Sequence, residues 1–187
     1  MGPRLLFLAG PNGAGKSTFF ELFLKGSGLP FANVDRIAAA LGVSDTEAAA
    51  AADAVRKQLV AEGTPFITET VFSDPVGAKL QFLRDAIAAD YRVTLHFIGL
   101  SSAQLSGARV SQRVRAGGHD VPSERLERRF LQSLENLHQA LEFVPEIHVY
   151  DNSSSESPFR HVLSVRAAQI EFIADPLPAW LKPIIPS

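Results

Sequence analysis

The chain has 187 residues, of which 46% are hydrophobic and 20% are charged. This length and composition predict one globular domain with its own hydrophobic core and exclude a disordered chain. The sequence contains no cysteine, which excludes a disulfide scaffold, a thiolate metal site and a cysteine nucleophile. The formal net charge of −2 disfavours binding to nucleic acid or to an anionic membrane surface. No apolar stretch reaches membrane-spanning length, so we expect a cytoplasmic protein.

Short hydrophobic segments alternate with helical segments along the chain. The expected strands are 5–9, 31–35, 66–70, 93–100 and 147–150, with a terminal hairpin within 159–173. The expected helices are 17–25, 44–61, 74–90, 101–116 and 123–143. This alternation predicts an α/β fold with a mainly parallel sheet flanked by helices. We expect residues 1–175 to form this domain and the Pro-rich residues 176–187 to form a surface tail.

Residues 10–17, Gly-Pro-Asn-Gly-Ala-Gly-Lys-Ser, match the phosphate-binding pattern G-x-x-x-x-G-K-[ST] between an expected strand and an expected helix. Glycines let backbone N–H groups curl around phosphate oxygens, and the helix N-terminus adds partial positive charge. In this pattern Lys16 reaches the β- and γ-phosphates and the Ser17 hydroxyl binds Mg²⁺. The nucleotide-binding residues are therefore expected to be Pro11, Asn12, Gly13, Ala14, Gly15, Lys16, Ser17 and Thr18.

A phosphate-binding loop does not define a reaction by itself. Residues 105–109 resemble the signature of ABC ATPases, but no hydrophobic strand ending in Asp-Glu follows them. The Asn-Lys-x-Asp motif with which GTPases recognise guanine is also absent. A small-molecule or nucleotide kinase remains. Such an enzyme requires a carboxylate that activates the acceptor, a strand end that holds it and a cationic lid.

Two carboxylates follow expected strands. Asp35 lies at the carboxyl end of the second strand and Glu69 at that of the third. Ligands of open parallel sheets bind at the carboxyl ends of the strands, so both side chains should share one edge with the phosphate-binding loop. One would accept the proton of an attacking hydroxyl, and the other would orient the substrate or hold Mg²⁺ through water.

Arginine is concentrated in one part of the chain. Residues 109–129 contain six of the thirteen arginines and no lysine. A guanidinium binds phosphate as a rigid fork, so we expect an Arg-rich helical lid at about 106–130, with Arg113 and Arg129 contacting phosphate. Asn152 follows the fifth strand and is expected to contact adenine.

The histidines show no spacing typical of a metal site. His96 and His148 lie within expected strands and are interpreted as satisfied core or edge residues.

Five segments together resemble the zeta-toxin family of P-loop kinases. They are GPNGAGKST at 10–18, NVD at 33–35, ETVFS at 69–73, RVRAGGHDVP at 113–122 and YDNS at 150–153. The resemblance implies an adenylate-kinase-like fold, with ATP and Mg²⁺ as the phosphoryl donor. The studied toxins phosphorylate a sugar hydroxyl of UDP-N-acetylglucosamine, and a separate small antitoxin is a conceivable partner.

The resemblance also assigns roles to residues. Lys16 and Ser17 match the phosphate and Mg²⁺ positions, Asp35 matches the general base, and Glu69 matches a substrate-binding glutamate. Arg113 and Arg129 match lid arginines. The studied toxins carry Glu-Gly-Thr where this chain has Glu69-Thr70-Val71, so Thr70 is the candidate for a substrate-binding threonine although it is out of register.

Two other functions are compatible with these motifs. The chain could be an ATP-dependent switch or degenerate kinase that acts through protein contacts, although intact Lys16, Ser17 and Asp35 argue against this. It could also phosphorylate a hydroxyl of a nucleoside or nucleic acid, which the net charge disfavours.

Overall fold

The computed structural model describes residues 2–33, 45–74, 76–115 and 123–185. Within them, one seven-stranded sheet has the order β2-β3-β1-β4-β5-β6-β7. Its strands are β1 (Arg4–Ala9), β2 (Phe31–Ala32), β3 (Phe66–Thr70), β4 (Arg92–Gly99), β5 (Glu146–Asp151), β6 (Arg160–Arg166) and β7 (Gln169–Ile173). Strands β1 to β5 pair in parallel, and β6 and β7 add an antiparallel hairpin. The predicted α/β class, parallel sheet and terminal hairpin are confirmed.

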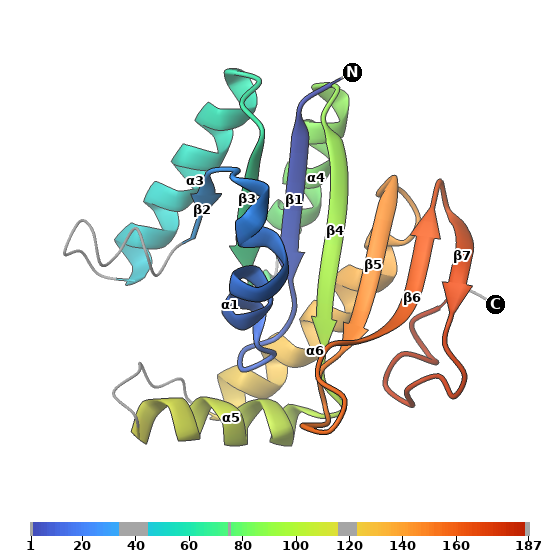
Figure 1. Cartoon of the computed structure of the whole chain (residues 1–187). Coiled ribbons are helices and arrows are strands. Elements are labelled where there is room, and N and C mark those ends of the chain that lie inside the picture. Colours follow the sequence, from blue (N-terminus) through green and yellow to red (C-terminus); the bar gives the residue numbers. More distant parts are fainter. Residues whose placement is uncertain (1, 34–44, 75, 116–122, 186–187) are drawn as a thin grey trace.

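Helices cover both faces of this sheet (Figure 1). They are α1 (Lys16–Phe19), continued by the π-helical η1 (Phe20–Leu24) and the 3-10 helix η2 (Lys25–Ser27), and then α3 (Asp45–Ala61), α4 (Ala78–Ala88), α5 (Ala103–Arg115) and α6 (Ser123–Ala140). Helix α1 lies on one face, α4 and α6 lie on the other, and α5 runs across the carboxyl end of the sheet (Figure 1). Within the described residues, no helix is long and apolar enough to cross a membrane.

Consecutive residues of the central strand β1 point to opposite faces of the sheet, as the backbone pleat requires. Leu6 and Leu8 pack with Phe19 of α1 on one face. Leu5 and Phe7 belong to the larger core on the other face, with residues of α4 and α6. Because both faces are covered, β1 is a continuous hydrophobic run in the sequence.

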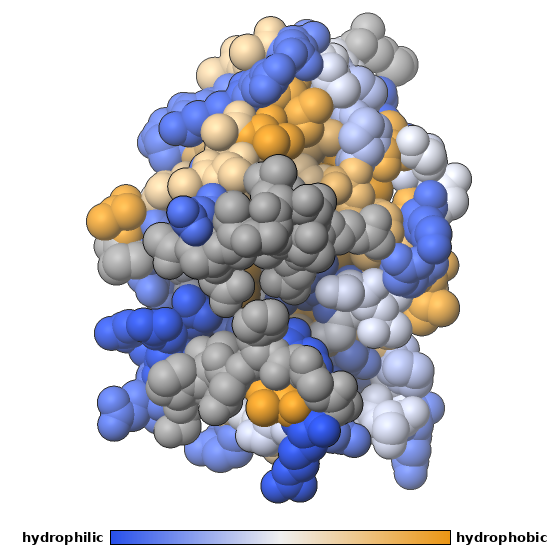
Figure 2. Space-filling view, turned by 90° about the vertical axis from the view of Figure 1, so that its left-hand side faces the viewer, coloured by the Kyte–Doolittle hydropathy of each residue, from blue (hydrophilic) through white to orange (hydrophobic). Residues whose placement is uncertain are grey.

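Two helices show how side-chain pattern determines packing. In α6, Leu126, Phe130 and Leu137 recur at helical spacing and are buried, as predicted. In α3, Ala48 and Ala52 are buried, while Ala49, Ala50 and Ala54 are exposed. The side of the molecule on which α3 lies accordingly mixes hydrophobic with hydrophilic surface (Figure 2).

The structure corrects the predicted start of α4. The helix begins at Ala78, four residues after the expected start at residue 74. The Asp74 carboxylate accepts the N–H groups of Ala78 (2.6 Å) and Lys79 (3.2 Å), so Asp74 caps the helix from a distance. Gly77, with a φ of 73°, provides the left-handed turn between them.

The expectation of a surface tail is wrong for Trp180, Leu181 and Ile184. All three are buried in the larger core. A Cβ on Gly99 of β4 would lie 2.1 Å from the Trp180 ring, so the absence of a side chain at Gly99 makes room for the indole. The part of the Pro-rich segment from Trp180 to Ile184 therefore packs as part of the domain.

Candidate nucleotide-binding and phosphoryl-transfer site

The loop between β1 and α1 has a backbone that only glycine adopts readily. Gly10, Gly13 and Gly15 have φ angles of 141°, 68° and 90°. A Cβ on Gly10 would lie 2.2 Å from the Ile98 carbonyl oxygen, and one on Gly15 would lie 2.7 Å from the Asn152 side-chain nitrogen. The glycines of the phosphate-binding loop, residues 10–17 (the P-loop), are thus required by conformation and by close packing.

Side chains from two other elements hold the P-loop in place. The Asn152 amide donates to the Ala14 carbonyl (2.9 Å), and its oxygen accepts the Phe159 N–H (3.2 Å). The Ser106 hydroxyl of α5 donates to the Asn12 carbonyl (2.7 Å). Ser106 and Asn152 are both buried. Asn152 therefore supports the loop, and its expected contact with adenine stays a prediction.

Three of the predicted site residues, Lys16, Ser17 and Glu69, lie where the P-loop meets β3. Lys16 is buried and its Nζ donates to the Pro11 carbonyl (3.1 Å). The Ser17 hydroxyl lies 3.3 and 3.4 Å from the two Glu69 carboxylate oxygens. Asn33, just after β2, donates from its amide to Glu69 (3.0 Å). The carboxyl ends of β1, β2 and β3 thus form one polar cluster, as expected for a parallel sheet.

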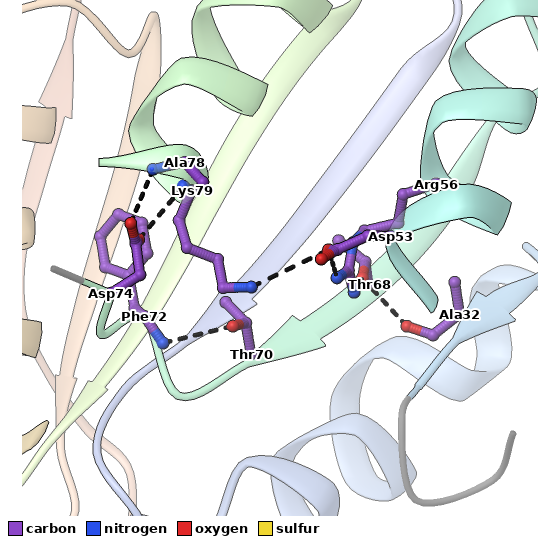
Figure 3. A network of polar contacts seen from close by, with 9 residues as sticks. All are labelled: Ala32, Asp53, Arg56, Thr68, Thr70, Phe72, Asp74, Ala78 and Lys79. Atoms are coloured by element: carbon purple, nitrogen blue, oxygen red, sulfur yellow. Dashed lines mark hydrogen bonds and ion pairs between the residues drawn. The ribbon is translucent and has the colours of Figure 1, made fainter. Parts of the chain in front are cut away.

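Neighbouring residues of β3 point in opposite directions. Glu69 faces Ser17 and the P-loop. Thr68 and Thr70 face the other side of the sheet, where Thr68 accepts from Arg56 of α3 (3.2 Å) and Thr70 lies beneath Lys79 of α4 (Figure 3). Because successive side chains of a strand point to opposite faces of the sheet, Glu69 lies on the face of the P-loop and Thr70 lies on the face covered by α4.

The predicted lid arginines occupy different environments. Arg113 on α5 is exposed, and Arg129 on α6 is partly buried. Burial lowers the pKa of Arg129, and the neighbouring Arg125 and Arg128 lower it further. Arg109 of α5 lies beside the second glycine of the P-loop. Arginine charge therefore lies on α5, where Arg109 is next to the P-loop, and on the start of α6.

Two predicted features lie outside the described residues: the candidate base Asp35, and the predicted tip of the lid at 117–120. Thr18, predicted to bind nucleotide, is exposed in α1.

Three of the histidines, His96, His148 and His161, form a row of neighbouring rings. Ring centroids of His96 and His148 are 5.5 Å apart, and those of His148 and His161 are 5.8 Å apart. His148 bonds the Ser164 hydroxyl (2.9 Å), as expected for a satisfied residue. His96 departs from that expectation, because its buried Nδ1 has no hydrogen-bond partner in the described part of the chain. No group of three metal-ligating side chains occurs within those residues.

Several residues in the site or on the opposite face of β3 were not predicted from the sequence. Asn33 belongs to the NVD segment and Ser106 to the signature-like segment 105–109, but the sequence assigned neither residue a role of its own. The burial of Arg56 could have been predicted from the sequence, because it follows Ala48 and Ala52 at four-residue spacing on the buried face of α3. A cation at such a position needs partners, which Thr68 and Asp53 supply. Lys79 left no comparable signal.

A parallel sheet of this order, with a glycine-rich loop between β1 and α1, defines a P-loop protein. The family model of the zeta toxin matches residues 35–161, more than half of the sequence. The chain therefore belongs to the zeta toxin family. Since the match begins after the P-loop, the loop is an observation additional to it. No curated protein matches the chain.

Solved structures with the same fold share little sequence identity. A chain from the PezAT toxin-antitoxin system of Streptococcus pneumoniae has a TM-score of 0.64 and 15% identity, over 89% of this chain and 76% of the other. A chain of the AvrRxo1-ORF1:ORF2 complex with ATP has a TM-score of 0.70 and 16% identity, over 94% of this chain and 61% of the other. A chain of the Pnkp1/Rnl/Hen1 RNA repair complex has a TM-score of 0.56 and 20% identity, over 74% of this chain and 46% of the other. The present chain thus spans less than two thirds of the latter two.

Proposed function

We propose that this protein is an ATP-dependent phosphotransferase that transfers the γ-phosphoryl group to a hydroxyl of a small molecule. The observation that carries the proposal is the convergence of Lys16, Ser17 and Glu69 at the carboxyl end of the sheet. Membership of the zeta toxin family supports it, as does the similarity in fold to a complex solved with ATP.

The residues at this edge fit a Mg²⁺-nucleotide. The Ser17 hydroxyl and the Glu69 carboxylate present oxygen atoms, the ligands that Mg²⁺ prefers. A Mg²⁺ ion that also takes phosphate oxygens and water needs no cage of three protein carboxylates. Bound there, the ion would neutralise charge on the β- and γ-phosphates. Ser17 would be its direct ligand, and Glu69 would hold it through water or orient the acceptor.

In the proposed reaction the acceptor oxygen forms a bond to the γ-phosphorus while the bond from that phosphorus to the β–γ bridging oxygen breaks, and ADP leaves. The acceptor's proton passes to a carboxylate, for which Asp35 is the candidate. Lys16, Arg113 and Arg129 stabilise the negative charge of the transferring group.

The acceptor proposed first is UDP-N-acetylglucosamine or a related nucleotide sugar, on the strength of the family. Thr70 is a candidate contact for it, together with Glu69. Two of the similar folds come from a toxin-antitoxin system and a two-protein complex. A small protein that blocks the nucleotide site is therefore a reasonable partner to seek.

The test measures ATP binding by calorimetry and ADP release in the presence of candidate acceptors. Lys16→Ala should reduce turnover by about a hundredfold or more while the circular dichroism spectrum stays unchanged. Lys182→Ala, a change at an exposed lysine far from the P-loop in sequence, is the matched control and should retain full turnover.

The alternatives predict different outcomes. ATP binding without ADP release from any acceptor would favour a switch that acts through protein contacts. Phosphorylation of RNA ends that weakens steeply with salt would favour a nucleic-acid kinase. Full activity of Asp35→Ala would refute the assignment of the base.

A further inference from the structure

A hollow of about 300 Å³ lies between α3 and α4, on the face of the sheet opposite α1. Phe7, Phe82 and Val60 supply apolar wall, and Arg56 and Lys79 bring two cations to it. The volume is at the lower end of the range for small-molecule sites, and a largely apolar wall with a few convergent polar groups is typical of such sites.

The two cations share one close carboxylate. Asp53 pairs with the Arg56 guanidinium, and its Oδ1 lies 4.0 Å from the Lys79 Nζ (Figure 3). The next carboxylate, Asp74, already accepts two backbone N–H groups at the start of α4. Lys57 and Asp85 add one charge of each sign to the wall, so they leave the net charge of the hollow unchanged.

The Lys79 ammonium is incompletely compensated in this setting. Burial lowers its pKa and Arg56 lowers it further, and the opposing effects of Asp53 and Asp74 do not restore it. The Arg56 side chain is only about 5% exposed, so its charge is poorly hydrated as well. An anion between the two cations would relieve both deficits.

The hollow adjoins the proposed reaction site through β3. Thr70 lines the hollow, and Glu69, the residue before it, contacts Ser17 on the opposite face. Their Cα atoms are about 3.8 Å apart, so only the end of one strand separates the two spaces. A molecule seated in the hollow that extends past this strand end would meet the P-loop side.

We propose that the hollow binds an anionic group of the phosphoryl acceptor, a phosphate or a carboxylate, through Arg56 and Lys79, so that the acceptor's hydroxyl lies at the end of β3 beside Glu69. The assignment rests on the proposed function. It defines the substrate class as hydroxyl compounds that carry a second, anionic group, with Arg56 and Lys79 determining specificity.

The experiment follows backbone amide signals of the full chain by NMR while inorganic phosphate is added in the presence of saturating Mg²⁺ and a non-hydrolysable ATP analogue. We expect saturable shifts at Asp53, Thr70 and Lys79. Lys79→Gln should raise the apparent Kd for phosphate by on the order of tenfold, and Lys182→Gln should leave it unchanged. Asp53→Asn removes the competing carboxylate from a half-exposed position and should tighten binding.

The outcomes separate the two proposals. Shifts at the P-loop on addition of the ATP analogue report the nucleotide site and so bear on the proposed function alone. Absence of shifts around the hollow, or an apparent Kd that neither Lys79→Gln nor Asp53→Asn alters, would overturn the assignment of the hollow. The amide spectrum also reports whether each variant is folded. If Lys79→Gln does not fold, the effect of Asp53→Asn on the apparent Kd still decides the test.

Discussion

His96 should make the stability of the fold depend on pH. It is buried in β4 beside Phe19, His148 and Tyr150, and its Nδ1 has no partner in the described part of the chain. Burial lowers its pKa from 6.5 to about 4, with a further contribution from His148. The folded protein therefore holds this imidazole neutral at pH values where the unfolded chain would protonate it.

The sign and the size follow from linkage. The pKa of His96 is lower in the folded protein than in the unfolded chain. Its contribution to the unfolding free energy is therefore fully present above pH 6.5 and is lost as the pH falls towards 4. A shift of about 2.5 units, from 6.5 to about 4, corresponds to about 3 kcal/mol of unfolding free energy in total. About 2 kcal/mol of it should be lost by pH 5.

The assay is urea unfolding at pH 8 and at pH 5, for the natural chain and for His96→Leu, which has a similar volume and cannot be protonated. The natural chain should lose about 2 kcal/mol more than the variant between these two pH values. Carboxylates contribute equally to both chains, so the difference isolates His96. Equal losses in the two proteins would refute the reasoning.

Two further changes test the packing of the site and of the C-terminal segment. Asn152→Ala removes the buried amide that donates to the Ala14 carbonyl, so it should weaken ATP binding by about tenfold in calorimetry. Asn152→Asp keeps the oxygen that accepts the Phe159 N–H but loses the donor to Ala14, so it should weaken ATP binding to a similar extent. Unchanged ATP affinity in both variants would show that the P-loop does not need this support. Trp180→Ala should lower the unfolding free energy by about 3–5 kcal/mol, measured in urea, because the indole fills the space over Gly99; a loss below about 1 kcal/mol would restore the view of residues 176–187 as a surface tail.

The parts of the fold that sequence could predict are those encoded by local pattern. The buried run at β1, the period-2 and period-3.6 patterns and the glycine spacing of the P-loop are all short-range signals. The placement of Glu69 beside Ser17 was also predictable, because parallel strands bring their carboxyl ends to one edge.

What sequence could not predict depends on contacts between distant segments. The burial of Trp180 requires a glycine eighty-one positions earlier, at Gly99, and no local pattern connects the two. Lys79 becomes significant only because α3 and α4 place it near Asp53 and Arg56. The role of Asn152 in holding Ala14 likewise follows from a tertiary approach of β5 to the P-loop.

The measurement that tests the central claim most directly is phosphoryl transfer from γ-labelled ATP to a panel of nucleotide sugars, sugar phosphates and nucleosides, followed by mass spectrometry, with Lys16→Ala alongside. A phosphotransferase of the proposed kind should add one phosphate to at least one hydroxyl acceptor, UDP-N-acetylglucosamine being the first to examine, and Lys16→Ala should abolish the product. ATP binding with no acceptor phosphorylated above the level of Lys16→Ala would contradict the assignment of the P-loop edge as a phosphoryl-transfer site.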